Sequence, residues 1–195
     1  PIDEGTILYS EVSLAKAVLR PSFILEKVNN PRDEKMAENL AFLLRERYAN
    51  RKVILIGATY HFMRNNQYII NNPDSRLEIE NSTIMGNLIY PEFKDEIYTI
   101  GFTAGGGHYG EVSGDEEGDE VPAPNANSLE AALNQQSFDQ AFVPLNVTNE
   151  ALGFWEYGPH MNLFYYETGM ASKQWEKILD AVIYIKEMEP VRMLE

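Results

Sequence analysis

The chain has 195 residues and a mass of 22.2 kDa, 44% of its residues are hydrophobic, and 30 acidic against 16 basic side chains give a net charge of −14. This composition is typical of a folded globular protein. The acidic charge argues against a nucleic-acid binder and against docking on anionic membranes, because both need a basic face. The absence of cysteine excludes disulfides, thiolate catalysis and cysteine-ligated zinc. No apolar run reaches the ~20 residues that a membrane span requires.

The first part of the chain is predicted to hold two helices and a buried strand. Apolar residues at near-helical spacing predict a helix over residues 6–19, which Pro21 ends. Residues 32–48 form the strongest helical pattern, and Asn50 is its expected carboxyl-terminal cap. Residues 52–57, Lys-Val-Ile-Leu-Ile-Gly, contain four successive apolar side chains, which predicts a strand buried on both faces.

Short helices and strands alternate along the rest of the chain. We predict a helix over 82–90 that Pro91 ends, a strand over 96–103, a glycine loop at 105–107, an exposed acidic loop over 111–126, a helix over 128–133, a strand over 141–145, a helix over 175–179 and a strand over 180–185. This alternation predicts an α/β fold, a mainly parallel sheet with flanking helices. Residues 1–195 form either a single domain or part of a longer one, and a chain that starts at Pro1 is expected to be a processed form or a portion of a longer polypeptide.

The loop after the first predicted strand holds the candidate catalytic residue. His61 follows the carboxyl end of that strand, where parallel sheets bind ligands, and histidine can act as a general acid or base near neutral pH. A half-buried histidine bonded to backbone is the alternative. Tyr60 and Arg64 lie in the same loop and are expected to bind substrate. Arg64 would hold an anionic group, although a solvated surface arginine is the other interpretation.

The glycine loop after the strand over 96–103 leads into His108 and Tyr109, which we expect at the same substrate site as His61. The three glycines allow close backbone approach, but the lysine and hydroxyl residue of a phosphate-binding loop are missing and no helix follows. We therefore predict no cofactor. The histidines lack the spacing of a metal site, and the acidic run at 115–120 does not fit a calcium loop, so we predict no metal. No G-x-S-x-G elbow occurs, which favours histidine-activated water over a serine nucleophile.

A series of short motifs then points to a known family. They are Arg-Asp-x-x-Met-Ala-x-Asn at 32–39, Ile-Gly-Ala-Thr-Tyr-His at 56–61, Met-Gly-Asn-Leu-Ile at 85–89, Tyr-x-x-Gly-Phe at 98–102, Ser-x-Glu-x-x-Leu at 128–133 and Asp-Ala-x-x-Tyr-Ile at 180–185. Together and in this order they resemble the erythromycin esterase-like family. The resemblance covers roughly residues 30–190.

The resemblance implies a bacterial carboxylic-ester hydrolase that takes part in antibiotic resistance. Such an enzyme opens macrolide lactones with a water molecule that a histidine activates, and it uses no metal. His61 matches the second histidine of the family motif, whereas Ala58 stands at the first and cannot move a proton. Nothing before Arg32 resembles the family's amino-terminal half, which carries a further histidine and a glutamate, taken to be the general base and its partner. The chain therefore resembles a carboxyl-terminal half that is inactive alone. The sequence does not decide between bacterial cytoplasm and periplasm.

Within this resemblance, His61 would orient a substrate carbonyl or stabilise developing charge, and Arg32 would reach the cleft or pair with a carboxylate. A hydrolase of a small-molecule ester or lactone requires His61 and His108 to converge on one pocket. The alternative is a non-catalytic ligand-binding or structural protein on the same scaffold, with a pocket lined by Tyr60, Tyr109 and Trp155. An incomplete half-domain would also expose apolar surface and associate with a partner or with itself.

Overall fold

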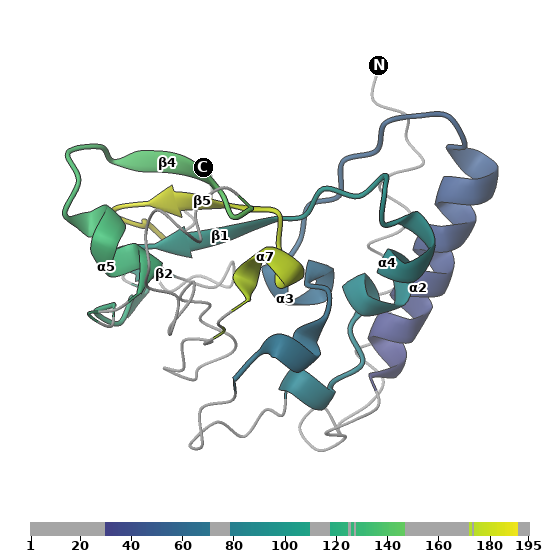
Figure 1. Ribbon diagram of the computed structural model, residues 1–195, viewed down its shortest axis with the longest axis horizontal. Helices are drawn as coiled ribbons and strands as arrows, with labels where there is room; N and C mark the ends of the chain where they lie inside the picture. Colours follow the sequence, from purple (N-terminus) through teal and green to yellow (C-terminus); the bar gives the residue numbers. More distant parts are fainter. Residues whose placement is uncertain are drawn as a thin grey trace.

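The computed structural model in Figure 1 describes residues 30–70, 79–109, 118–124, 126, 128–146, 172 and 174–190. Its elements are α2 (Pro31–Phe42), the π-helical turn η2 (Leu43–Arg47), α3 (Thr59–Phe62), the 3-10 turns η3 (Asn66–Tyr68) and η4 (Ile79–Asn81), α4 (Met85–Phe93), β1 (Ile100–Ala104), β2 (His108–Tyr109), β3 (Asp119–Glu120), α5 (Leu129–Asn134), β4 (Gln140–Pro144), α7 (Trp175–Ile178) and β5 (Ala181–Ile185). The helix predicted over 6–19 lies outside the described residues. No helix in the described part of the chain is both long and apolar enough to cross a membrane.

Helix α2 begins as its sequence predicts and ends in an unusual turn. The Asn30 side chain accepts a hydrogen bond from the backbone N–H of Asp33, and Pro31 occupies the first helical position, where its missing N–H costs nothing. The helix continues through η2, and Asn50 then adopts a left-handed conformation with φ of 73°. The capping residue is Tyr48, so the prediction of Asn50 as the cap is wrong, and Asn50 lies two residues beyond it.

The main sheet has three strands in the order β1-β5-β4. β1 pairs with β5 in parallel, and β4 pairs with β5 antiparallel. The prediction of a mainly parallel sheet is therefore wrong, because the sheet is mixed. β4 runs against β5, since Gln140 is paired with Ile185 and Pro144 with Ala181. The alternation of helices and strands along the sequence does not fix the direction in which a strand enters the sheet.

The predicted strand over residues 52–57 is also absent. These residues belong to no helix or strand, and the side chains of residues 51–58 are exposed. Their apolar pattern predicted burial between strands, but no described strand pairs with their backbone groups. Helix α4 also differs from expectation, since it passes Pro91 and ends at Phe93, whose ring packs against the α2–α4 cluster.

Two apolar clusters hold the described elements together. The larger one joins the inner face of the sheet to α5 and α7, and Tyr60 of α3 packs against it; its centre includes Leu129, Val182, Trp175 and Ile178. The smaller one lies between α2 and α4 and is built on Ala37, Leu40, Met85 and Ile89. Figure 1 shows α3 between the sheet and the α2–α4 pair, so this short helix connects the two clusters.

A small hairpin extends from the carboxyl end of β1. β2 and β3 pair antiparallel, with His108 opposite Glu120, and Gly107 turns the chain with φ of 95°, a backbone conformation that favours glycine. Residues 111–117 and 125 of the predicted acidic loop lie outside the described residues. Within the same predicted loop, residues 119 and 120 form β3 and Val121 is buried. The glycine loop therefore starts a hairpin instead of a helix.

Candidate functional site

The side chains of Asp33 and His61 form a buried hydrogen-bonded pair. A carboxylate oxygen of Asp33 lies 2.9 Å from His61 Nδ1. The Asp33 side chain is 0% exposed and the His61 side chain 13% exposed. An ionised carboxylate can only accept, so the proton of the imidazole sits on Nδ1 and Nε2 is left as the acceptor. Among the described residues, no hydrogen bond to His61 Nε2 is found, and this nitrogen can take a proton from a reacting group.

Three elements meet at Asp33 and fix its position. Asn30 Nδ2 donates to Asp33 Oδ1 at 2.9 Å, and the backbone N–H of Met85 donates to Asp33 Oδ2 at 2.9 Å. The second bond serves the amino terminus of α4, whose capping residue Ile84 offers no side-chain acceptor. Asp33 therefore links the starts of α2 and α4 to His61 on α3. A carboxylate held from three sides presents a fixed acceptor to the imidazole.

Tyr60 lies beside the pair and remains protonated over a wide pH range. Its ring meets the His61 ring edge-on, with centroids 5.2 Å apart. Burial raises the pKa of the Tyr60 phenol, and the nearby Asp33 carboxylate raises it further, while contacts with Ser82 and Asn30 act in the opposite direction. A neutral phenol can donate a hydrogen bond, so Tyr60 is a candidate donor at the edge of the site.

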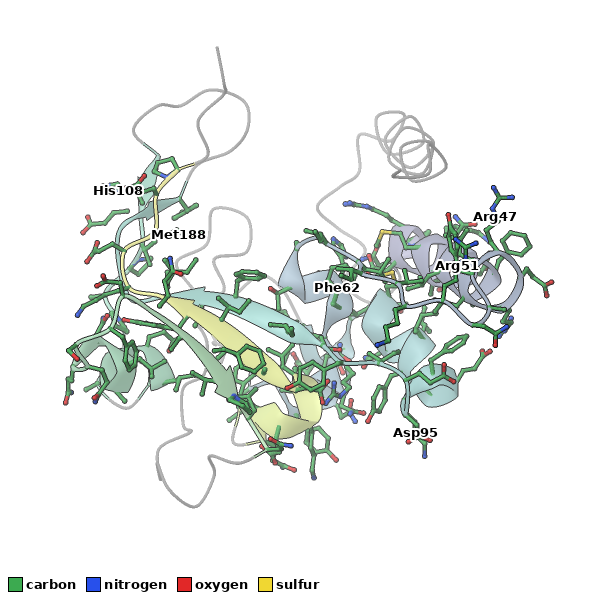
Figure 2. The ribbon with its side chains drawn as sticks, turned by 90° about the horizontal axis from the view of Figure 1, so that it is seen from above. Arg47, Arg51, Phe62, Asp95, His108 and Met188 are labelled. Atoms are coloured by element: carbon green, nitrogen blue, oxygen red, sulfur yellow. The ribbon has the colours of Figure 1, made fainter. Side chains whose placement is uncertain are left out.

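A close contact between backbones sets the position of α3. A Cβ atom added at Gly86, the second residue of α4, would lie 2.2 Å from the carbonyl oxygen of Met63 and 2.5 Å from that of Phe62. Only glycine allows this approach. Figure 2 shows Phe62, which follows His61 in the sequence, between the sheet and the α2–α4 pair. Gly86 thus determines how closely α3 approaches α4. It thereby also determines how closely His61, on α3, approaches Asp33.

Arg64 is buried and forms an ion pair with the partly exposed Asp180, whose side chain is 25% exposed. Its two terminal nitrogens each donate to a different carboxylate oxygen at 2.7 Å. Asp180 also accepts from the backbone N–H of Thr99 at 2.7 Å, and the guanidinium lies 4.9 Å from the centre of the Tyr90 ring. The structure therefore gives Arg64 a bridging contact between the loop after α3 and the starts of β1 and β5. Its predicted contact with an anionic substrate group stays a prediction.

The structure does not bring the other predicted residues to His61. His108 is exposed on β2, and Figure 2 places it beside Met188, at the far end of the sheet from Phe62. Tyr109 follows it on the same strand and is half-buried, and Arg32 is exposed at the second position of α2. The convergence of His61 and His108 on one pocket is not observed in the described part of the chain. Trp155 and the third histidine, His160, lie outside it.

Asp33 and Asn30 are the site residues that the sequence analysis did not single out. Asp33 belongs to the motif at 32–39, but acidic residues are common in first helical turns because they offset the helix dipole. Asn30 likewise has an ordinary function as a helix cap. Only the approach of His61, 28 residues further along, gives Asp33 a chemical partner. Among the described residues, no group of three or more His, Asp or Glu side chains could hold a metal ion.

A mixed sheet with helices on one face defines an α/β protein, and the buried carboxylate–histidine pair is its candidate site. The erythromycin esterase family model matches residues 13–188, and the chain belongs to this family. The resemblance in the sequence motifs is thereby confirmed.

Individual relatives agree with this membership. A Bacillus subtilis (strain 168) protein named "Putative hydrolase YbfO" is 29% identical over 163 residues, which are 82% of this chain and 35% of that protein. The structure of an erythromycin esterase mutant, EreC, in its open conformation has a TM-score of 0.51 and 13% identity over 80% of this chain and 36% of that one. A crystal structure of a Bacillus cereus protein has a TM-score of 0.58 and 16% identity over 84% of this chain and 40% of that one. The chain thus spans little more than a third of these relatives.

Proposed function

We propose that the chain provides the Asp33–His61 pair of a hydrolase that cleaves a carboxylic ester or lactone with an activated water molecule. The observation that carries the proposal is the buried carboxylate 2.9 Å from His61 Nδ1. Family membership supports it, as does the hydrolase name of the Bacillus subtilis relative. Small-molecule esters, with macrolide lactones among them, are the substrate class.

The proposed step moves one proton through His61, in place of the orienting or charge-stabilising role that the resemblance implies for it. Nε2 accepts a proton from water while the water oxygen bonds to the carbonyl carbon, and the imidazolium then returns the proton to the departing alkoxide oxygen as the C–O bond breaks. The Asp33 carboxylate holds the productive tautomer and stabilises the imidazolium by its charge. Tyr60 would donate a hydrogen bond to the substrate or to the developing oxyanion. No metal takes part in this step.

Departures from the family pattern limit what the chain does alone. Ala58, at the place of the first motif histidine, is an exposed residue before α3 and has no group that can carry a proton. The chain spans 35% of the Bacillus subtilis relative, and the resemblance places a further histidine and glutamate in the part that is not spanned. We infer that the 195 residues alone have no ester hydrolase activity and that hydrolysis belongs to the natural polypeptide that carries them.

The test is an ester hydrolysis assay on that natural polypeptide, with a 4-nitrophenyl ester and a macrolide lactone as substrates. His61→Ala should lower kcat by about 100-fold or more, the usual contribution of a proton-transferring group. Lys94→Ala, an exposed change in the turn after α4, is the control and should leave the rate unchanged. Equal rates for His61→Ala and the unmodified protein would overturn the proposal and favour a non-catalytic ligand-binding or structural protein.

A further inference from the structure

The segment over residues 52–57 is the most exposed apolar stretch in the described structure. Ile54 is 87% exposed and Ile56 93%, and Val53 and Leu55 are exposed as well. Four neighbouring apolar residues in water are unfavourable, because burying each such side chain would contribute about 1.5–3 kcal/mol. Contiguous exposed apolar surface of this kind marks an interaction site.

This segment leads into Thr59, whose side chain contacts the open edge of the main sheet. β1 is an edge strand, since only β5 pairs with it among the described strands. Thr99 O accepts from Ala181 N and Gly105 N donates to Ile185 O, so the odd-numbered residues of β1 turn their backbone groups toward β5. The even-numbered residues Ile100, Phe102 and Ala104 turn theirs outward, where the Phe102 N–H meets the Thr59 hydroxyl at 3.4 Å. Apart from this Phe102 N–H, the outer edge therefore offers backbone groups for a further strand.

The outer face of the same sheet is apolar too. Phe102, Ile183 and Phe142 occupy equivalent register positions on the three neighbouring strands. Phe102 is 52% exposed and Phe142 54%, whereas the residues beside them in the strands, such as Val143 and Val182, are buried against the helices. Sheets with parallel pairing are normally covered on both faces. The edge and this face form one continuous region that lacks a cover in the described structure.

We propose that residues 52–57 and the open edge of β1 form a docking surface for an apolar β-strand supplied by the part of the family fold that this chain does not span. The chain covers 35% of the Bacillus subtilis relative and 36% and 40% of the two solved chains, so most of that fold lies outside it. A second copy of the chain is a poorer occupant, because each copy carries a net charge of −14 and the two would repel.

The test pairs the tagged 195-residue chain with the unmatched remainder of the Bacillus subtilis relative, both expressed in the same cells. The two polypeptides should co-purify in equal amounts. Hydrogen exchange at the amides of residues 53–57 should slow at least about tenfold in the complex relative to the chain alone. This readout measures strand docking, so it can succeed or fail independently of any hydrolytic activity.

Matched variants locate the contact. Ile54→Asp combined with Ile56→Asp places two charges on exposed positions, which leaves the fold of the chain intact by circular dichroism but should abolish co-purification. Leu88→Asp, an exposed apolar residue on α4, should not affect it. Unchanged hydrogen exchange at residues 53–57 when both polypeptides are present would overturn the proposal. Slow hydrogen exchange at these residues in the monomeric chain alone, or in a dimer of two identical chains, would overturn it as well.

Discussion

Arg64 and Asp180 lie 116 residues apart in the sequence and form a two-point ion pair, with both nitrogen–oxygen distances at 2.7 Å. The pair joins the loop after α3, which follows His61, to the start of β5. Asp180 extends the connection to β1 through the Thr99 N–H. The position of the candidate site relative to the sheet therefore depends on a contact between distant parts of the chain.

Replacing Asp180 with Asn should strongly destabilise the protein. The variant leaves the buried Arg64 guanidinium without a counter-charge. Because Asp180 is 25% exposed, the loss of unfolding free energy should lie below the ~3–5 kcal/mol that loss of one partner costs in a fully buried pair. Urea denaturation measures this loss. The control is Glu92→Gln, which breaks the exposed Arg45–Glu92 pair and should have no measurable effect. Similar losses in both variants would contradict the structural role of the Arg64–Asp180 pair.

Asp33→Asn should lower hydrolysis by the natural polypeptide with little change in KM. A carboxamide cannot stabilise the imidazolium by charge, and it allows the His61 ring to adopt the other tautomer; we expect kcat to fall about 10²- to 10⁴-fold. Nitrogen-15 NMR of the imidazole in the 195-residue chain reports the tautomer directly. In the unmodified protein it should show the imidazole proton on Nδ1 and not on Nε2. Glu34→Gln, the exposed neighbour on α2, should alter neither measurement. An unchanged NMR spectrum in Asp33→Asn would argue against the pair.

Gly86→Ala should destabilise the protein by about 1–3 kcal/mol, the range for forcing extra atoms into a packed interior. The new methyl group would collide with the carbonyl oxygens of Met63 and Phe62, which are backbone atoms that cannot move aside. Thermal unfolding measures the effect. At Gly106 an added Cβ would meet nothing nearer than 3.7 Å, so Gly106→Ala is the matched control and should be tolerated. Equal melting temperatures for Gly86→Ala and the control would refute the close approach of α3 to α4.

Tyr60 should make the protein less stable at alkaline pH. Burial raises the pKa of its phenol above the ordinary value of 10.0, so the unfolded chain loses this proton first. The stability that Tyr60 contributes is complete below about pH 10 and is lost as the pH rises through the folded-state pKa. Tyr60→Phe should reduce the fall in unfolding free energy between about pH 9 and about pH 11. Tyr98→Phe, a change at an exposed tyrosine, should leave that fall unchanged.

Several elements could be predicted from local sequence because their signals are local. The start of α2 follows from Asn30 and Pro31, and β5 follows from a run of apolar residues after Asp180. The apolar run at 52–57 carries an equally strong strand signal, yet it forms no strand in the described structure. Strand formation requires hydrogen-bond partners on a neighbouring strand, which a residue's own sequence window cannot supply.

The sequence by itself determined the family, the acidic composition and most of the helix positions, and it singled out His61 as the candidate catalytic residue. Each of these depends on residue identity or on contacts within a few residues. Only the tertiary structure decided that Asp33 is the partner of His61, that Arg64 pairs with Asp180, that His108 lies away from both, and that the sheet is mixed. These features depend on contacts between residues 28 to 116 positions apart, and such contacts are fixed by packing of the whole chain.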